Sequence, residues 1–186
     1  MNYRIVYHIM ALLMGLFFLN ACTKEVDFNQ IDELELNPIV ESSIIYVDSP
    51  ASQFYNNGEI TVSQDFVLID IFNNKLTVDY LTKAEFTFES TNSIDREFQL
   101  QIDFVDGNDT TQYSVTLLAP QSPNNTDIVT EQLVVFEGNS LQALKSAVKI
   151  VFTITLQSGS PINENTIGNI QLKSKGLFYF TINDTL

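Results

Sequence analysis

The stretch "EFQLQIDFVDGNDTTQYSVTL", residues 97–117, decides the fold class. From Glu97 to Phe104 polar and apolar side chains alternate, which is the pattern of a strand with one buried and one solvated face. The run "DGND" at 106–109 supplies turn residues, and the alternation resumes at Tyr113. The stretch therefore predicts a β-hairpin and, with it, an antiparallel architecture.

The same period of two recurs on both sides of this hairpin. Further strands are predicted at 43–47, 66–72, 76–81, 85–89, 132–137, 150–156, 169–173 and 178–182. Together these segments give roughly nine short strands separated by turns, which is typical of an all-β, antiparallel β-sandwich, Ig-like or similar. Within 138–149 the period changes, because Leu141, Leu144 and Val148 fall at helical spacing. We expect one short helix there, with Lys145 and Lys149 near its C-terminal end.

Charge restricts the possible partners. All 23 acidic residues but only eight of the nine basic ones follow Cys22, so the side chains after that point carry a net charge of −15. Such a negative field repels phosphate backbones and anionic membrane surfaces. We therefore expect no nucleic-acid partner and no peripheral membrane contact through basic patches.

The single histidine, His8, and the single cysteine, Cys22, both lie in or beside the N-terminal apolar run. The rest of the chain thus has no residues for Ser-His-Asp or Cys-His catalysis, for imidazole or thiolate zinc sites, or for disulfides. Only carboxylates, lysines and hydroxyls remain for chemistry. We expect no cofactor and no enzymatic activity.

The N-terminal run has the features of an export signal. One cation, Arg4, precedes an apolar stretch over 5–19, which is shorter than the roughly 20 residues of a spanning helix. The run ends in Leu19-Asn20-Ala21-Cys22, which resembles a bacterial lipobox. The resemblance implies cleavage before Cys22, diacylglyceration of its thiol and acylation of its new amine. The alternative is an ordinary signal peptide with an incidental cysteine.

The segment after the cysteine carries an acidic bias, with five acids and one base between residues 23 and 37. Its first residues, "TKEVD" at 23–27, are similar to the lysine-plus-acid signals that send lipoproteins of Bacteroidota-type bacteria to the outer face of the outer membrane. The alternative is a solvated acidic tether. We expect a signal peptide at 1–21, the lipidated cysteine and tether at 22–37, and the sandwich at 38–186. The resemblance is to small, uncharacterised lipoproteins of these bacteria, on the periplasmic or cell-surface face.

Glycoside hydrolysis requires a pair of carboxylates, and four acids of the chain are candidates for this pair. Asp70 lies within an apolar run, where burial would raise the pKa of its carboxyl group. Glu85, Glu89 and Asp103 fall on polar strand faces, where solvent exposure is the simpler interpretation. A carboxylate-dependent hydrolase is one alternative function.

The predicted turn also carries a weak calcium candidate, because Asp103, Asp106, Asn108 and Asp109 supply hard oxygen ligands. Their spacing does not follow the EF-hand order, and ordinary hairpin chemistry explains them equally well. The same turn contains the first of two aspartate-hydroxyl patterns, at 109–111 and 184–186. These resemble the O-glycosylation motif of exported Bacteroidota-type proteins, which implies modification of Thr110 and Thr185.

The remaining class of function is the binding of a ligand or a partner. Tyr55, Tyr80 and Tyr179 are candidates for stacking on sugar rings, which gives a second alternative, a glycan-binding accessory module of a polysaccharide-uptake system. Arg96 is flanked by Asp95 and Glu97, and we expect it to pair locally. The leading hypothesis is a non-enzymatic, membrane-anchored lipoprotein that binds a protein or a surface component through loops at one end of the sandwich. The candidate loops are 56–58, 91–95, 119–127 and 157–168.

Overall fold

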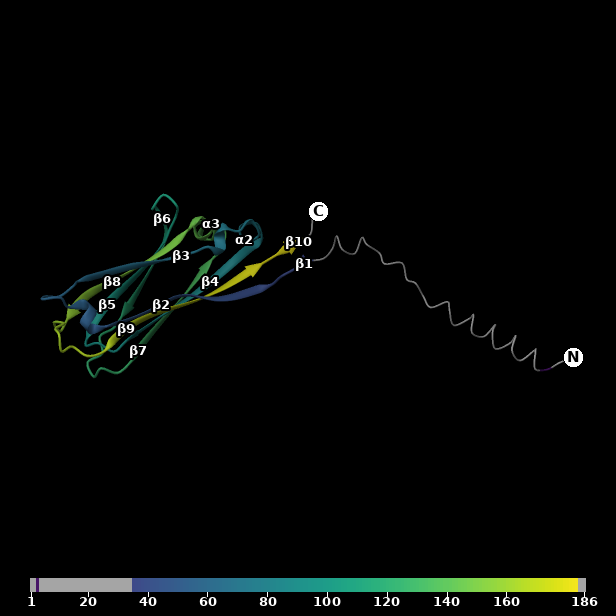
Figure 1. Ribbon diagram of the computed structural model, residues 1–186. Helices are drawn as coiled ribbons and strands as arrows, with labels where there is room; N and C mark the ends of the chain where they lie inside the picture. The colour runs from purple at the N-terminus through teal and green to yellow at the C-terminus, as the bar shows by residue number, and fades with distance from the viewer. Residues whose placement is uncertain (1–2, 4–34, 184–186) are drawn as a thin grey trace. The chain divides into compact units, whose positions relative to one another are not determined.

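Eight strands form two four-stranded antiparallel sheets in this protein (Figure 1). The structure, a computed structural model, describes residue 3 and residues 35–183. One sheet has the order β2-β9-β4-β7 and the other β3-β8-β5-β6, while β1 pairs with β10. The strands are β1 (Glu35–Leu36), β2 (Ile39–Pro50), β3 (Val62–Leu68), β4 (Leu81–Asn92), β5 (Arg96–Val105), β6 (Thr111–Ala119), β7 (Ile128–Phe136), β8 (Lys149–Gly159), β9 (Asn169–Phe180) and β10 (Ile182–Asn183). The helical elements are η2 (Ala51–Phe54), η3 (Ile71–Asn73), α2 (Lys75–Tyr80) and α3 (Gly138–Ser146).

The strand pairs are nested about the hairpin that the sequence predicts. β5 pairs with β6, and outside this hairpin β4 pairs with β7, β3 with β8 and β2 with β9. The chain is therefore one long antiparallel ribbon folded over into two sheets, which is an eight-stranded jelly roll. The predicted all-β sandwich is confirmed. The strand order, which the sequence left open, is that of a jelly roll and not the ABED and CFG grouping of the Ig fold.

The core lies between the inner faces of the two sheets. The period of two in β4 and β5 sends every second side chain inward, and these side chains are buried. Phe86 is at the centre, with ring centroids 5.5 Å from Phe104, 5.3 Å from Phe136 and 5.7 Å from Phe178. These edge-on aromatic contacts link strands of both sheets and hold the ribbon in its folded-over form.

Three predicted strands differ from the structure. Residues 75–80 form helix α2, although Leu76, Val78 and Tyr80 alternate with polar residues as in a strand. The segment leads from β3 in one sheet to β4 in the other, so it cannot extend either sheet. The predicted strands at 169–173 and 178–182 are joined in β9, which runs through Gly176 to Phe180.

The boundaries of two other elements also shift. The predicted strand over 66–72 is β3 at 62–68, followed by a turn into η3. The predicted helix is confirmed as α3, but it ends at Ser146 because Lys149 already pairs with Leu68 and Val105 in β8. Its N-terminus is capped by Glu137, which forms a capping box with Ser140.

The described body has two distinct ends. Helices α2 and α3 and the short β1–β10 sheet are at the end where the chain enters at Glu35, and the long connections are at the other end (Figure 1). Strand β2 leads from one end to the other over 12 residues, which corresponds to about 40 Å. Among the described residues, no helix is both long enough and apolar enough to cross a membrane.

Candidate functional site

Four connections meet at the end of the sandwich away from Glu35. We call this region the loop end: residues 51–61, 93–95, 120–127 and 160–168. Hydrogen bonds join the connections to one another: Ala51 N donates to Gly168 O at 3.0 Å, and Ser122 N donates to Ile94 O at 2.9 Å. The sequence predicted four candidate loops in these regions, and the structure brings them together.

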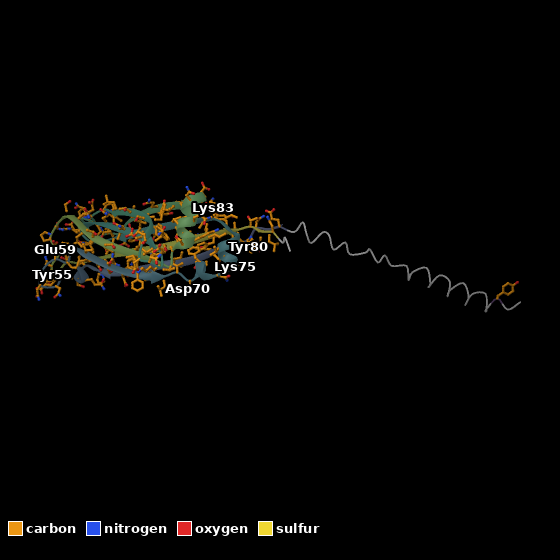
Figure 2. All side chains as sticks on the ribbon, turned by 90° about the horizontal axis from the view of Figure 1, so that it is seen from above. Tyr55, Glu59, Asp70, Lys75, Tyr80 and Lys83 are labelled. Atoms are coloured by element: carbon orange, nitrogen blue, oxygen red, sulfur yellow. The ribbon has the colours of Figure 1, made fainter. Side chains whose placement is uncertain are left out.

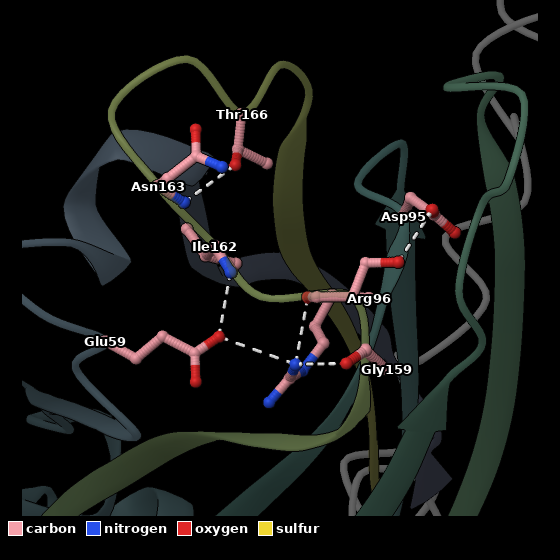
Figure 3. A network of polar contacts seen from close by, with 8 residues as sticks. Glu59, Asp95, Arg96, Gly159, Ile162, Asn163 and Thr166 are labelled. Atoms are coloured by element: carbon pink, nitrogen blue, oxygen red, sulfur yellow. Dashed lines mark hydrogen bonds and ion pairs between the residues drawn. The ribbon is translucent and has the colours of Figure 1, made fainter.

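Arg96 connects two of these loops (Figure 3). Its Nη1 donates to Gly159 O at 2.7 Å and to Ser160 O at 2.9 Å, and lies 3.4 Å from Glu59 Oε1. The same Glu59 oxygen accepts the Ile162 N–H at 2.8 Å. The Arg96 side chain is only 11% exposed, so these partners surround a largely buried cation.

The predicted local pairing of Arg96 is therefore wrong. Its acidic partner is Glu59 of the β2–β3 connection, whereas the neighbouring Asp95 accepts a hydrogen bond from Ser160 at 3.1 Å. The reason is geometric: consecutive residues of a strand point to opposite sides, so the side chains on either side of Arg96 point away from it. The buried Nε of Arg96 has no hydrogen-bond partner among the described residues. The network holds the connections of the loop end together.

Buried side-chain amides and close backbone approaches fix the rest of the loop end. Asn92 donates to Arg96 O and to Pro120 O, each at 2.7 Å, while its own oxygen accepts the Ile94 N–H at 2.9 Å. Gly168 has φ +102°, and a Cβ there would lie 2.5 Å from Ser93 O. The loops therefore form a preorganised surface.

The candidate hydrolase acids do not form a catalytic pair. Asp70 is exposed rather than buried in a strand, and it precedes η3, well separated from Glu59 (Figure 2). Glu89 lies 3.6 Å from Lys173 across the β4–β9 ladder. Asp103 is on the other sheet, where its carboxylate accepts hydrogen bonds from Ser114 at 2.5 Å and from Gln101.

Glu85 is held as a carboxylate. Lys83 lies 2.5 Å from its Oε1, and the Tyr179 hydroxyl donates to its Oε2 at 2.9 Å. The hydrogen bond from Lys83, followed by that from Tyr179, keeps the pKa of Glu85 below its ordinary value. The hydrogen bond to Glu85 correspondingly raises the pKa of Lys83 and of Tyr179. A general acid needs a raised carboxyl pKa, so this arrangement is suited to joining two strands and not to proton transfer.

Acidic side chains of the candidate calcium site make other contacts in the structure. Asp106 Oδ1 accepts the Asn108 N–H at 2.8 Å and the Thr110 N–H at 2.9 Å, and Asp109 pairs with Lys149 at 2.5 Å. The Thr110 bond, then the Asn108 bond, lowers the pKa of Asp106. Within the described part of the chain, no three acidic, histidine or cysteine side chains group as metal ligands. Asp103, Asp106, Asn108 and Asp109 therefore act as turn and strand residues here.

The three candidate tyrosines do not share one platform. Tyr55 is at the loop end, and Tyr80 is the last residue of α2, toward the other end (Figure 2). Tyr179 is opposite Lys83 in the β4–β9 ladder, and the Lys83 ammonium lies 4.9 Å from the centre of its ring. A sugar ring would therefore meet these side chains singly and not as a surface.

Of the candidate modification sites, the structure describes Thr110. Thr110 is exposed in the turn between β5 and β6, where an enzyme could reach its hydroxyl. Thr185, Cys22 and the lipobox lie outside the described residues.

The sequence analysis missed two acids, Asp48 and Asp65. Both line a cleft of about 410 Å³ between β2 and β3, above the buried side chains of Phe152 and Ile154. The sequence gives no signal for Asp65, since alternation over 62–68 puts the apolar Phe66 and Leu68 on one face and predicts that the opposite face, with Asp65, is solvated.

Comparisons with known proteins place this chain in no family. No protein-family model matches it, and a search of curated proteins gave no match. Among solved structures it is similar to VP2 of the infectious bursal disease virus subviral particle, with 11% identity and a TM-score of 0.43 over 79% of this chain and 33% of that one. A candidate secreted protein from Parabacteroides distasonis gives 16% identity and a TM-score of 0.41 over 61% of this chain and 36% of that one. The chain thus spans about a third of the length of these two proteins.

Proposed function

We propose that this protein is a lipid-anchored envelope protein of bacteria that holds a preorganised binding surface, the loop end, away from the membrane. The observation that carries the proposal is the position of the loops relative to the point where the chain enters the sandwich. The chain enters at Glu35, beside the helices, while the four loops gather at the opposite end (Figure 1). A chain anchored through Cys22 would therefore present these loops farthest from the anchor.

Support for the anchor comes from the residues themselves. Leu19-Asn20-Ala21-Cys22 follows an apolar run of secretory length and precedes an acidic segment. Two or more acyl chains on one cysteine anchor a protein stably, whereas a single chain binds a membrane only marginally. We propose the outer membrane as the site, with the domain on its periplasmic or outer face.

Binding is proposed in preference to catalysis because of the chemistry that the loop end offers. The buried cation Arg96 and its partner Glu59 are engaged in contacts between loops, while Asp127 and Glu164 are exposed. Its outer surface carries neutral amide side chains, such as Asn57 and Asn163, and the exposed Ile167. Amide and apolar groups on a rigid frame suit recognition of a protein or surface component.

Fractionation of cells tests the anchor. We expect the wild-type chain in the membrane pellet, with acyl chains on Cys22 detected by mass spectrometry of the N-terminal peptide. Cys22→Ala should move the protein to the soluble fraction, while the matched control Thr23→Ala should stay in the pellet. Retention of Cys22→Ala in the membrane would refute the lipoprotein assignment.

Site-specific photo-crosslinking in intact cells tests the binding surface. A crosslinker at Asn57 or Ile167 probes the loop end, and one at the exposed Thr82 or Ser146 probes the helix end. We expect a discrete adduct from the first two positions only. Adducts from all four positions, or only from the helix end, would contradict the assignment of the loop end as the binding surface.

A further inference from the structure

A groove runs along one side of the sandwich, between the outermost strands of the two sheets. β2 and β3 each end a sheet, so each has one row of backbone groups with no neighbouring strand. The 410 Å³ cleft lies between residues 47–49 of β2 and 63–65 of β3. A second cleft of about 190 Å³ lies between residues 42–44 and 67–69. We call the two clefts together the edge groove.

The two clefts are consecutive parts of one groove. Residue numbers rise along β2 while they fall along β3, so the strands run antiparallel on its two sides. From residue 42 to residue 49 the groove is about 25 Å long. That length accommodates an extended segment of about seven residues.

Strand β3 is the place where the sandwich is least covered. All of its residues are exposed except the half-buried Val67, including Ser63 and Asp65 on the side toward the core. The outermost strands on the opposite side differ, because β6 and β7 bury their inward residues, among them Leu117 and Phe136. The inner face of β3 is therefore less covered than those of β6 and β7.

The chemistry of the groove is acidic over an apolar floor. Asp48 and Asp65 line the larger cleft, Asp70 lines the smaller one, and none of the described residues lining either cleft is basic. Asp48 accepts hydrogen bonds from Asn169 at 2.6 Å and from Gln171 at 3.1 Å, and Asp65 accepts the Phe66 N–H at 2.8 Å. These donors are neutral, so they do not offset the negative charges of Asp48 and Asp65.

We propose that the edge groove binds an extended segment of another protein that adds to the outer edge of β3 as a further strand and places lysine or arginine side chains opposite Asp48 and Asp65. Backbone hydrogen bonds to a sheet edge supply the affinity in such strand addition, and side-chain pockets supply the specificity. The negative charge of the groove favours a segment that carries lysine or arginine. The assignment does not depend on the lipid anchor or on the loop end.

A second copy of this chain is the less suitable occupant. Pairing β3 with β3 of another copy would bring their acidic residues together, and inward-pointing charges on an outer strand are a known protection against such pairing. A glycan is also less suitable, because among the described residues that line the clefts the aromatic rings are those of the buried Phe152 and Phe178.

The test uses the chain from residue 22 onward, carrying Cys22→Ala, and a synthetic seven-residue peptide of alternating valine and lysine. Calorimetry should show saturable 1:1 binding. Hydrogen exchange should show new protection of β3 amides and no change in β7. A peptide with glutamate in place of lysine should not bind. A peptide of identical charge with N-methyl groups on alternate backbone amides should also fail, because it cannot pair with a strand edge.

Variants of the protein locate the site. Asp65→Asn should weaken binding about two- to fivefold, the range for one partly exposed charge pair. The matched control Glu131→Gln removes an exposed acid from β7 and should leave the affinity unchanged. Equal binding of the N-methylated peptide, protection outside β3, or formation of a dimer that excludes the peptide would each overturn the proposal.

Discussion

Arg96 shows how one side chain can set the structure of a whole loop cluster. Its Nη1 contacts two backbone carbonyls of the β8–β9 connection and one carboxylate oxygen of Glu59. A guanidinium group presents several donors in a fixed plane, so it can serve such oxygens together, whereas a lysine ammonium acts as a point charge. The residue is therefore a structural clamp for the loop end.

Removing this clamp should cost stability. We expect Arg96→Ala to lower the free energy of unfolding by about 3 kcal/mol, because Glu59 loses its cation and two carbonyls lose a charged donor. Urea denaturation measures the change. The control is Lys175→Ala, whose ion pair with Glu41 is exposed and 3.2 Å long. It should cost less than about 1 kcal/mol, and a similar loss for both variants would argue against the clamp.

Asp106 should make the free energy of unfolding depend on pH. Two backbone N–H groups lower the pKa of its carboxyl group from the ordinary 3.8. The folded state therefore favours the charged form, and this stabilisation is complete at neutral pH and lost as the pH falls through the folded-state pKa. We expect Asp106→Asn to be less stable than the parent protein at pH 7, with the gap narrowing at pH 3.

Urea midpoints at the two pH values measure this difference. The control is Asp127→Asn in an exposed loop. It should shift the urea midpoint only slightly, and by the same amount at pH 7 and at pH 3. A gap for Asp106→Asn that stays constant with pH would contradict the assignment.

At the scale of elements, local pattern was sufficient for the strands that form the middle of the ribbon. Strands β5 and β6 are joined by a five-residue turn, so their pairing is local and the alternation of residues 97–117 predicts it directly. α3 was also predicted from local signals, its helical spacing and the polar residues at its start.

Other features depend on contacts that no local pattern encodes. α2 has the alternation of a strand, but its position between two sheets imposes a helix. The partner of Arg96 comes from a different connection, and the edge groove depends on which strands end each sheet. Sequence reasoning therefore found the loops of the candidate site but neither its clamp nor the groove.

The β8–β9 connection should tolerate no side chain at Gly168. Its φ of +102° is rarely adopted by other residues, and a Cβ would lie 2.5 Å from Ser93 O. We expect Gly168→Ala to lower the free energy of unfolding by about 2–3 kcal/mol. The control Gly107→Ala lies in open space in the β5–β6 turn and should change it by less than about 1 kcal/mol. Thermal unfolding of the two variants gives the comparison, and equal stability would refute a close approach at Gly168.

At the scale of the whole molecule, the folded-over ribbon is held together by contacts between its two sheets. Nested pairing joins strands within each sheet, but it does not by itself press one sheet against the other. That role belongs to the buried phenylalanines, since Phe86 of β4 packs against Phe104 of β5 in the opposite sheet. The sandwich should therefore unfold as one cooperative unit.

Phe86→Ala tests this dependence on the contact between sheets. Phe86 is fully buried, and its truncation should lower the free energy of unfolding by about 3–5 kcal/mol, because the variant loses burial and leaves a cavity between the sheets. Phe66→Ala is the matched control, because Phe66 is 56% exposed on β3. It should cost less than about 1 kcal/mol, mainly through its contact with the Lys149 ammonium. Guanidinium denaturation followed by tyrosine fluorescence and by circular dichroism should give coincident transitions for both variants. Separate transitions, or equal losses at the two positions, would show that the sheets are held together by contacts other than the phenylalanine core.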